Sequence, residues 1–213
     1  MKKNFLSLFI ALLIVLPVPF YGQSVENNFQ QRYSTSIEYK ASKKFSFVLS
    51  PEIRTKNNAI SIDEYLMEGA VGYELIDWFE VGGRYRLRNK SSKTLQRIAI
   101  EASVKRSLGR FAPSLRLMLT NENEIGSNAP SEKLWRTRFK LKYKRLTRIL
   151  NPYSSIEAFR NLDENEWQKM RYLIGAQFRL NKYFQLDLQY KFDYFLSKFQ
   201  NDHIIGLNLK IKL

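Results

Sequence analysis

A segment near the C-terminus, residues 182–196, alternates large apolar side chains with polar ones at every second position. Its apolar set is Phe184, Leu186, Leu188, Tyr190, Phe192, Tyr194 and Leu196, and its polar set includes Gln185, Asp187, Gln189, Lys191 and Asp193. A period of two places each set on its own face of a β-strand, whereas a helix would mix the two sets around its circumference. Strands of soluble proteins are usually about 5–6 residues long, while a strand that crosses lipid needs about 9–11. The segment therefore predicts a long strand with one apolar and one polar face.

The same alternation recurs along the chain in about eleven candidate strands, with no convincing helix. Connections look short near residues 42, 76, 108, 148 and 182, and longer near residues 58, 91, 126, 164 and 199. Outer-membrane barrels of bacteria have short periplasmic turns, longer outer loops and an even number of strands. We therefore predict an all-β, antiparallel, up-and-down transmembrane β-barrel of about 10–12 strands. Twelve is preferred, with an irregular first strand that uses Gln23–Asn28, and the C-terminus is expected in the periplasm.

A soluble lipocalin-like barrel or a sandwich is the alternative, because period two alone does not tell the inside from the outside. Three features favour lipid: the length of the strands, the end of the chain on a strand, and aromatic residues toward strand ends, as in the girdles of membrane barrels. These aromatic residues are Tyr33, Tyr39, Phe45, Trp78, Tyr143, Tyr172, Phe184 and Tyr194.

The N-terminus has the pattern of a secretory signal peptide over residues 1–22. Lys2 and Lys3 precede the apolar run Phe5–Leu16, and Gly22–Gln23 is a plausible cleavage point. A single membrane anchor is the alternative, but the run is shorter than the roughly 20 residues of a spanning helix. Residues 1–22 are therefore expected to be a cleaved signal peptide and residues 23–213 the barrel domain.

The chain is basic, with 35 Lys and Arg against 20 Asp and Glu, and it has no cysteine. The missing cysteines exclude disulfides, thiolate metal sites and a lipid-modified N-terminal cysteine. A basic balance often indicates nucleic acid, but these cations recur at alternate strand positions and export argues against that partner. Anionic lipid headgroups and lipopolysaccharide phosphates are the expected neighbours, and the bacterial outer membrane is the expected location.

Several short motifs resemble one known family, and together they cover nearly the whole mature chain. They are PEIRTK with Arg54, GGRYRLRNK with Arg84, Arg86 and Arg88, NPYSSIEAFRNL with Glu157, KYFQLDLQYKF, and the terminal HIIGLNLKIKL. The chain thereby resembles DUF2490, a family of uncharacterised Bacteroidetes-type exported proteins. The resemblance implies an outer-membrane β-barrel without an assigned activity, and it supplies no catalytic residues. The outer-membrane assembly machinery is an expected partner, although Leu213 stands where many outer-membrane proteins end in an aromatic residue.

The single histidine, His203, is the one candidate for catalysis. It lies beside Asp202, and further acids occupy other expected outer loops: Glu122, Glu124, Asp163, Glu164 and Glu166. General acid–base chemistry in a hydrolase or acyltransferase at the mouth would need such groups. No nucleophile motif, Gly-rich phosphate loop or metal-ligand spacing accompanies them. The prediction is a protein that is not an enzyme and that uses no cofactor or metal.

Charged residues on the polar strand faces are the candidate functional set. Placed in a lumen they form a predicted charge network of Arg54, Glu64, Glu68, Arg84, Arg86, Arg88, Glu101, Arg116, Arg136, Arg138, Glu157 and Asp187. Lone charges are costly to bury, so these groups are expected to pair or to keep water. A lumen filled by ion pairs indicates a structural or surface-interaction barrel, which is the preferred function because a barrel of this size has a small interior. A narrow, weakly anion-selective pore for small solutes is the alternative.

Overall fold

The computed structural model describes residues 26–213 except 57–58, 92 and 197–199, so the predicted signal peptide lies outside the described residues and stays a prediction. The described chain forms strands β1 (Glu26–Lys40), β2 (Phe45–Lys56), β3 (Ser61–Ile76), β4 (Phe79–Lys90), β5 (Lys93–Lys105), β6 (Phe111–Glu124), β7 (Glu132–Tyr143), β8 (Leu150–Asn161), β9 (Glu166–Arg179), β10 (Phe184–Phe195) and β11 (Gln200–Lys212). Within this part of the chain, no helix has the length and hydropathy of a membrane span.

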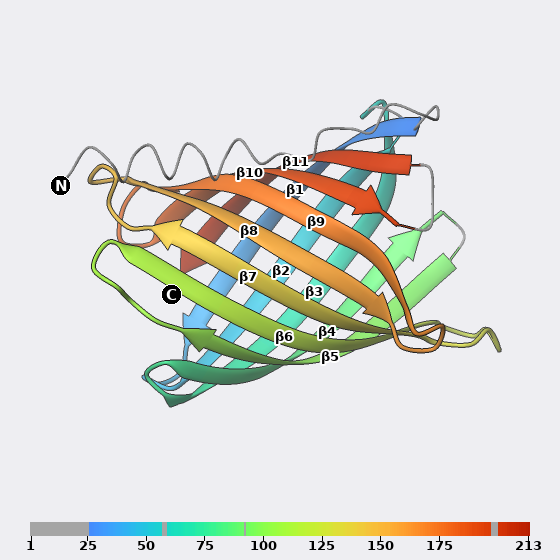
Figure 1. The fold of residues 1–213 in the computed structure, drawn as a ribbon, viewed down its shortest axis with the longest axis horizontal. Coiled ribbons are helices and arrows are strands. Elements are labelled where there is room, and N and C mark those ends of the chain that lie inside the picture. Colours follow the sequence, from blue (N-terminus) through green and yellow to red (C-terminus); the bar gives the residue numbers. More distant parts are fainter. Residues whose placement is uncertain (1–25, 57–58, 92, 197–199) are drawn as a thin grey trace.

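The strands close into a single barrel in which each strand pairs with its neighbours in the chain and β1 pairs with β11 (Figure 1). The described residues thus confirm the predicted all-β barrel of 10–12 strands, with eleven. The expectation of an even number is wrong. With an odd number of alternating strands, the first and last run in the same direction, and β1 and β11 meet in parallel from Glu26↔Gln200 to Glu38↔Lys212. Asn27 and Asn28 belong to β1 itself, and residues 23–25 lie outside the described part.

The connections at the two ends of the barrel do not differ in length as predicted. The C-terminal end carries connections 41–44, 77–78, 106–110, 144–149 and 180–183, and the opposite end carries 57–60, 91–92, 125–131, 162–165 and 196–199. Connection 144–149 is longer than 162–165, so the prediction of short turns at the C-terminal end and longer loops at the opposite end is wrong. The reason is that polar residues continue the strands: Asn121–Glu124, expected in a loop, pair with β5 as part of β6.

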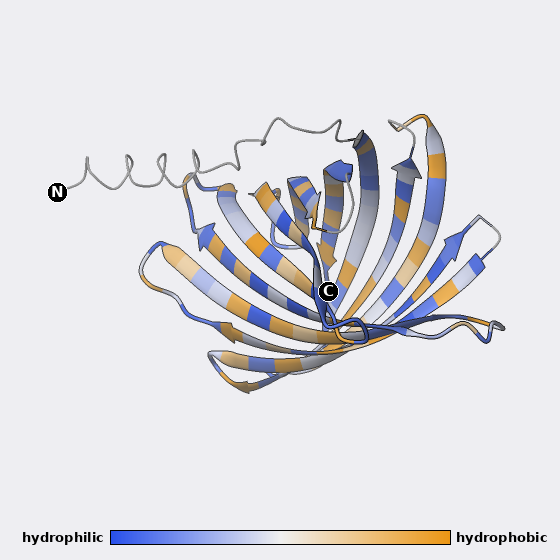
Figure 2. Ribbon diagram, turned by 45° about the vertical axis from the view of Figure 1, so that its right-hand side comes forward, coloured by the Kyte–Doolittle hydropathy of each residue, from blue (hydrophilic) through white to orange (hydrophobic). Residues whose placement is uncertain are grey.

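The barrel is apolar outside and polar inside. Ile100 and Leu188 point outward and are 62% and 46% exposed, whereas the inward Glu157 and Asp193 are 4% and 1% exposed. Figure 2 shows the matching alternation of apolar and polar residues along the strands. A soluble barrel would bury its apolar set instead. The observed orientation therefore contradicts the soluble alternative and gives the fold of a membrane-spanning barrel.

Aromatic side chains gather at both ends of the wall. Residues Tyr39, Phe45, Trp78, Tyr143 and Phe184 lie at the C-terminal end, and Trp167 and Tyr194 lie at the opposite end. Tyr33 and Tyr172, predicted near strand ends, lie within their strands, because β1 and β9 extend further than the alternation indicated. The remaining aromatic residues keep the arrangement typical of girdles at lipid interfaces.

One stretch of the wall lacks regular pairing. The β1–β2 register is continuous to Ser34↔Glu52 and resumes at Ile37↔Leu49, and Pro51 lies in the interruption. Proline has no backbone N–H to donate to a neighbouring strand. On the lumen side, hydroxyl contacts span the gap instead, since Ser50 Oγ lies 3.0 Å from Ser36 Oγ.

Candidate functional site: the charged lumen

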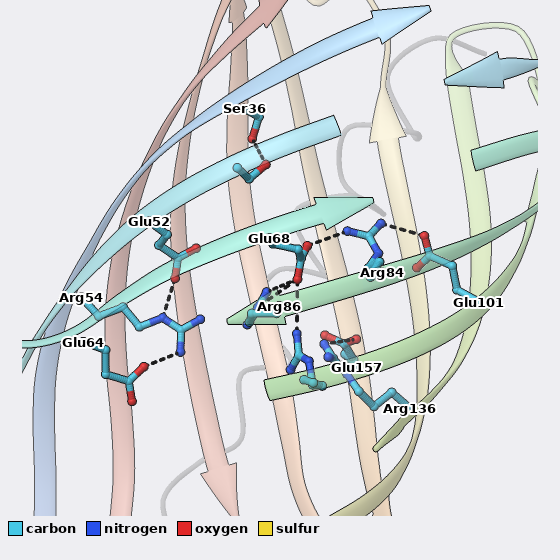
Figure 3. A network of polar contacts seen from close by, with 12 residues as sticks. Ser36, Glu52, Arg54, Glu64, Glu68, Arg84, Arg86, Glu101, Arg136 and Glu157 are labelled. Carbon is cyan, nitrogen blue, oxygen red and sulfur yellow. Dashed lines mark hydrogen bonds and ion pairs between the residues drawn. The ribbon is translucent and has the colours of Figure 1, made fainter. Parts of the chain in front are cut away.

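Strand alternation brings all twelve residues of the predicted charge network to the inner face of the barrel. They come from strands β2 to β8 and β10. Figure 3 shows members of this network on neighbouring strands, with acids and arginines directed toward one another. The following contacts show which of them the structure joins.

The first cluster of ion pairs is centred on Glu68 of β3. Its carboxylate lies 2.9 Å from Arg84, 2.6 Å from Arg86 and 3.4 Å from Arg97. Arg84 also contacts Glu101 of β5 at 2.7 Å. One acid thus organises three arginines from β4 and β5, and the register explains why, because Glu68 is directly opposite Arg86.

A second cluster continues the network to β8. Arg116 of β6 bridges Glu101 at 3.3 Å and Glu157 at 3.0 Å, and Arg136 of β7 contacts Glu157 at 2.9 Å. The guanidinium carbon of Arg136 also lies 4.7 Å from the ring centroid of Phe159. Ion pairs therefore run without interruption from β3 to β8 around this side of the lumen.

A third cluster lies toward the opposite end from the C-terminus. Arg54 of β2 contacts Glu52 at 2.5 Å and Glu64 at 3.1 Å. Arg88 of β4 contacts Glu64 at 3.2 Å and also pairs with Glu122 of β6. Glu64 is 3% exposed, so its charge is compensated by arginines from two strands rather than by bulk water.

Two of the predicted residues are not joined to the network by ion pairs in the described structure. Asp187 accepts hydrogen bonds from the Tyr153 hydroxyl at 2.7 Å and from Gln177 at 3.1 Å. Arg138 lines an inner cavity, and its buried Nε has no hydrogen-bond partner among the described residues. Alternation therefore places all twelve residues on the inner face, but only ten of them are joined by ion pairs in the described structure.

The candidate set also omitted a fourth cluster. Asp193 of β10, 1% exposed, contacts Arg171 of β9 at 2.5 Å and Lys169 at 2.9 Å. Arg171 is directly opposite Asp193 in the register, and cross-strand pairs of opposite charge stabilise a sheet. Alternation placed these residues on the polar faces, but only the pairing of β9 with β10 shows that they meet.

Two cavities occupy the lumen between these clusters. One, of about 410 Å³, lies toward the end opposite the C-terminus, and the other, of about 420 Å³, lies toward the C-terminal end. Both are lined by Glu52, Arg86 and Lys191. These three residues therefore lie between the two cavities and contribute to the wall of each.

Tyr153, whose hydroxyl donates a hydrogen bond to Asp187, packs against Gly175, the residue opposite it on β9. A Cβ built on Gly175 would lie 2.6 Å from Cζ of Tyr153, closer than the ring allows. We expect Gly175→Val to displace the ring, break its bond to Asp187 and destabilise the barrel by about 1–3 kcal/mol. Equilibrium unfolding in urea measures this. Gly69→Val is the control, because a Cβ at Gly69 meets no atom within 4 Å, and an equal loss in both variants would contradict the steric explanation.

The histidine is separated from its neighbouring acid. His203 lies on the outer face, where Nδ1 is 2.7 Å from the Tyr190 hydroxyl and the Phe192 ring centroid is 5.1 Å from the imidazole centroid. Asp202 points inward and accepts a hydrogen bond from Asn28 at 3.1 Å. The pair that sequence adjacency suggested for acid–base chemistry is thus divided by the barrel wall.

The expected loop acids are likewise distributed rather than gathered. Glu122 pairs with Arg88, Glu124 with Lys93, and Asp163 with Lys133. Glu164 accepts a hydrogen bond from Asn161, and Glu166 is an exposed residue at the start of β9. No group of three or more His, Asp or Glu side chains that could hold a metal ion occurs in the described residues.

Solved structures with a similar fold include porins. The NanC porin in a rhombohedral crystal form has a TM-score of 0.51 and 10% identity, covering 76% of this chain and 85% of that chain. The KdgM porin has a TM-score of 0.51 and 11% identity, covering 77% and 89%, and KdgM in complex with disordered oligogalacturonate has 0.51 and 10%, covering 79% and 91%. At such identities the likeness is one of fold.

Sequence comparison gives the family directly. No protein with a curated description matches the chain. The family model described as "Protein of unknown function (DUF2490)" matches residues 29–202, which is most of the described barrel. The chain therefore belongs to the DUF2490 family.

Proposed function

We propose that the protein is an outer-membrane barrel exported with residues 1–22 as its signal peptide. The apolar outer wall, the aromatic residues at both ends and the porin fold support this location. The barrel is inserted with the help of the outer-membrane assembly machinery, which handles proteins of this architecture.

The connections at the C-terminal end suggest contact with anionic lipid. They carry one acid, Asp77, against eight cations: Lys43, Lys44, Arg106, Arg110, Lys144, Arg145, Arg148 and Lys182. Basic residues next to a membrane surface are attracted to anionic headgroups. With the C-terminus in the periplasm, phosphates of anionic lipids in the periplasmic leaflet are the partners that this charge favours.

For the lumen we propose a narrow, anion-selective pore for small solutes. The observation that carries this is the pair of lumen cavities, one toward each end of the barrel, that share Glu52, Arg86 and Lys191 in their walls. Ten cations and six acids line the first cavity, and five cations and three acids line the second. An excess of Lys and Arg along a wet path favours anions over cations.

The competing function is a closed structural or surface-interaction barrel. The ion pairs between β3 and β8 support it, because their side chains occupy much of a small lumen. The cavities favour the pore, since each is larger than the roughly 30 Å³ that a water molecule occupies in the liquid. Conductance separates the two functions.

Purified protein in planar bilayers is expected to give small, reproducible channels that favour chloride over potassium. Arg138→Glu should lower this preference, because Arg138 lines the second cavity without an ion-paired acid in the described chain. Reversal potentials in a salt gradient measure the change. Arg110→Glu, in the exposed connection 106–110, is the control. Conductance at background level would leave the closed barrel as the function.

The positions of His203 and Asp202 support a role without catalysis. His203 faces outward and is separated from Asp202 by the wall, which supports a transport or structural role over a hydrolase or acyltransferase at the mouth.

The similar KdgM porin is described with disordered oligogalacturonate, a polyanion. Acidic oligosaccharides are therefore suitable solutes for the conductance measurements.

A further inference from the structure

Three of the cations that line the two cavities have no ion pair with any acid in the described part of the chain: Arg32, Arg138 and Lys191. Arg32 and Lys191 lie on β1 and β10, the two strands that flank β11. Arg138 lies on β7, in another part of the wall. The parallel seam thus brings together two of the three cations that lack an acid.

A glycine forms the floor between these two cations. Gly206 of β11 is opposite Arg32 on one side and opposite Gln189 on the other. A Cβ built on Gly206 would lie 3.7 Å from Cβ of Gln189 and 3.8 Å from Nζ of Lys191. Because Gly206 has no side chain, the side chains of Gln189 and Lys191 pack directly over its buried backbone on the inner wall.

The charges around this space do not compensate one another. The charged groups that act electrostatically on Lys191 are Arg32, Arg171 and Arg54, with Glu52 as the one acid among them. Glu52 is already bonded to Arg54, and Asp193 holds Arg171.

Among the described residues, the Arg32 side chain donates one hydrogen bond, to Gln30 at 3.3 Å, and its buried Nε has no partner. Two like charges held close together and partly out of water are unfavourable unless an anion joins them. The surplus of positive charge at this seam is therefore suited to a bound anion.

We propose that Arg32, Gln189 and Lys191 form an oxyanion-binding site beside Gly206, where Arg32 lines the first cavity, Gln189 the second and Lys191 both. The guanidinium of Arg32 matches a carboxylate or phosphate group with paired N–H donors, and Lys191 adds an ammonium. The Gln189 side chain, turned so that its amide nitrogen rather than its Oε1 faces Gly206, donates a further hydrogen bond. This site deepens the proposed pore and rests on a lumen that solutes can enter. Its ligand class is a small solute with one oxyanion group.

The test is calorimetric titration of the purified barrel in neutral detergent at low ionic strength. Gluconate and inorganic phosphate are the probes, and glucose is the uncharged counterpart of gluconate. We expect an oxyanion to bind and glucose not to bind. Arg32→Gln and Lys191→Gln should each weaken binding about tenfold or more, the loss expected for one charged hydrogen bond. Whichever probe binds more tightly identifies carboxylate or phosphate as the preferred group.

Two further variants separate a built site from the general charge of the lumen. Gly206→Leu adds a side chain between Gln189 and Lys191 without changing any charge and should also weaken binding about tenfold or more. Lys140→Gln removes one positive charge from β7, where the Nζ lies 3.7 Å from the ring centroid of Tyr153, and should leave affinity unchanged. Heat-modifiable migration on gels shows which variants are folded.

The outcomes distinguish this inference from the proposed pore. Failure of both oxyanions to bind better than glucose overturns the site, and so does an equal loss of affinity in Lys140→Gln and Lys191→Gln. Oxyanion binding that depends on Arg32 and Lys191 supports the site even where planar bilayers show no conductance, in which case the pore alone is wrong. Conductance without such binding leaves the pore and removes the site.

Discussion

Leu188→Arg is expected to destabilise the barrel in a phospholipid bilayer by about 2–4 kcal/mol. Leu188 lies near the middle of β10, points outward and is 46% exposed, with Ala176 and Leu207 as its neighbours on the adjoining strands. An arginine there would meet acyl chains, which cannot hydrate its charge. Equilibrium unfolding in urea, with the protein in vesicles, measures the free energy of unfolding.

Gln185→Arg is the matched control on the same strand. Gln185 faces the second lumen cavity, where water can solvate an added guanidinium. We expect its effect to be within about 1 kcal/mol, in line with substitutions that bury no charge. Equal losses for the two variants would contradict the assignment of the apolar face to lipid. In a soluble barrel, by contrast, the arginine at position 188 would meet water.

Glu157→Gln is expected to destabilise the barrel by about 3 kcal/mol, the lower part of the range for breaking a buried ion pair. Glu157 is 4% exposed and lies 3.0 Å from Arg116 and 2.9 Å from Arg136. Its neutralisation leaves Arg136, 9% exposed, without an ion-paired acid in the described structure. Urea unfolding of the two proteins in the same vesicles gives the difference.

A double variant and a surface control make this result specific. Glu157→Gln combined with Arg136→Gln should recover part of the loss, because no uncompensated guanidinium is then buried at that position. Glu132→Gln, at an exposed position where the carboxylate accepts a hydrogen bond from Gln168, should change stability by about 0.5 kcal/mol or less. A loss at Glu132 equal to that at Glu157 would show that burial of the pair is not the cause.

Much of the architecture is already determined by alternation in the sequence. The polar and apolar sets of residues 182–196 fall on opposite faces of β10, and Glu157, Glu68 and Arg136 lie on the polar faces of their strands as a period of two requires. This works because side-chain direction in a strand is a local property of the backbone. Motif resemblance also identified the DUF2490 family, which the match over residues 29–202 confirms.

Strand ends were less predictable because polar residues such as Asn121–Glu124, which are more typical of loops, can also continue a strand. Whether such residues pair depends on a neighbouring strand that is distant in sequence. The even number of strands was predicted wrongly for the same reason. An odd number requires β1 and β11 to pair in parallel, and only closure of the whole sheet brings these two strands together. Local patterns contain no information about which strands meet at closure.

The side of the wall that faces lipid, and the partner of each charge, were decided only by tertiary structure. Alternation gives two faces but not their environment, so only barrel closure shows Asp193 buried and Ile100 exposed. Register across strands then selects Arg171 for Asp193 and divides His203 from Asp202. It also places Gly206 between Arg32 and Gln189, a juxtaposition of residues far apart in the chain that arises because β1 and β11 close the sheet.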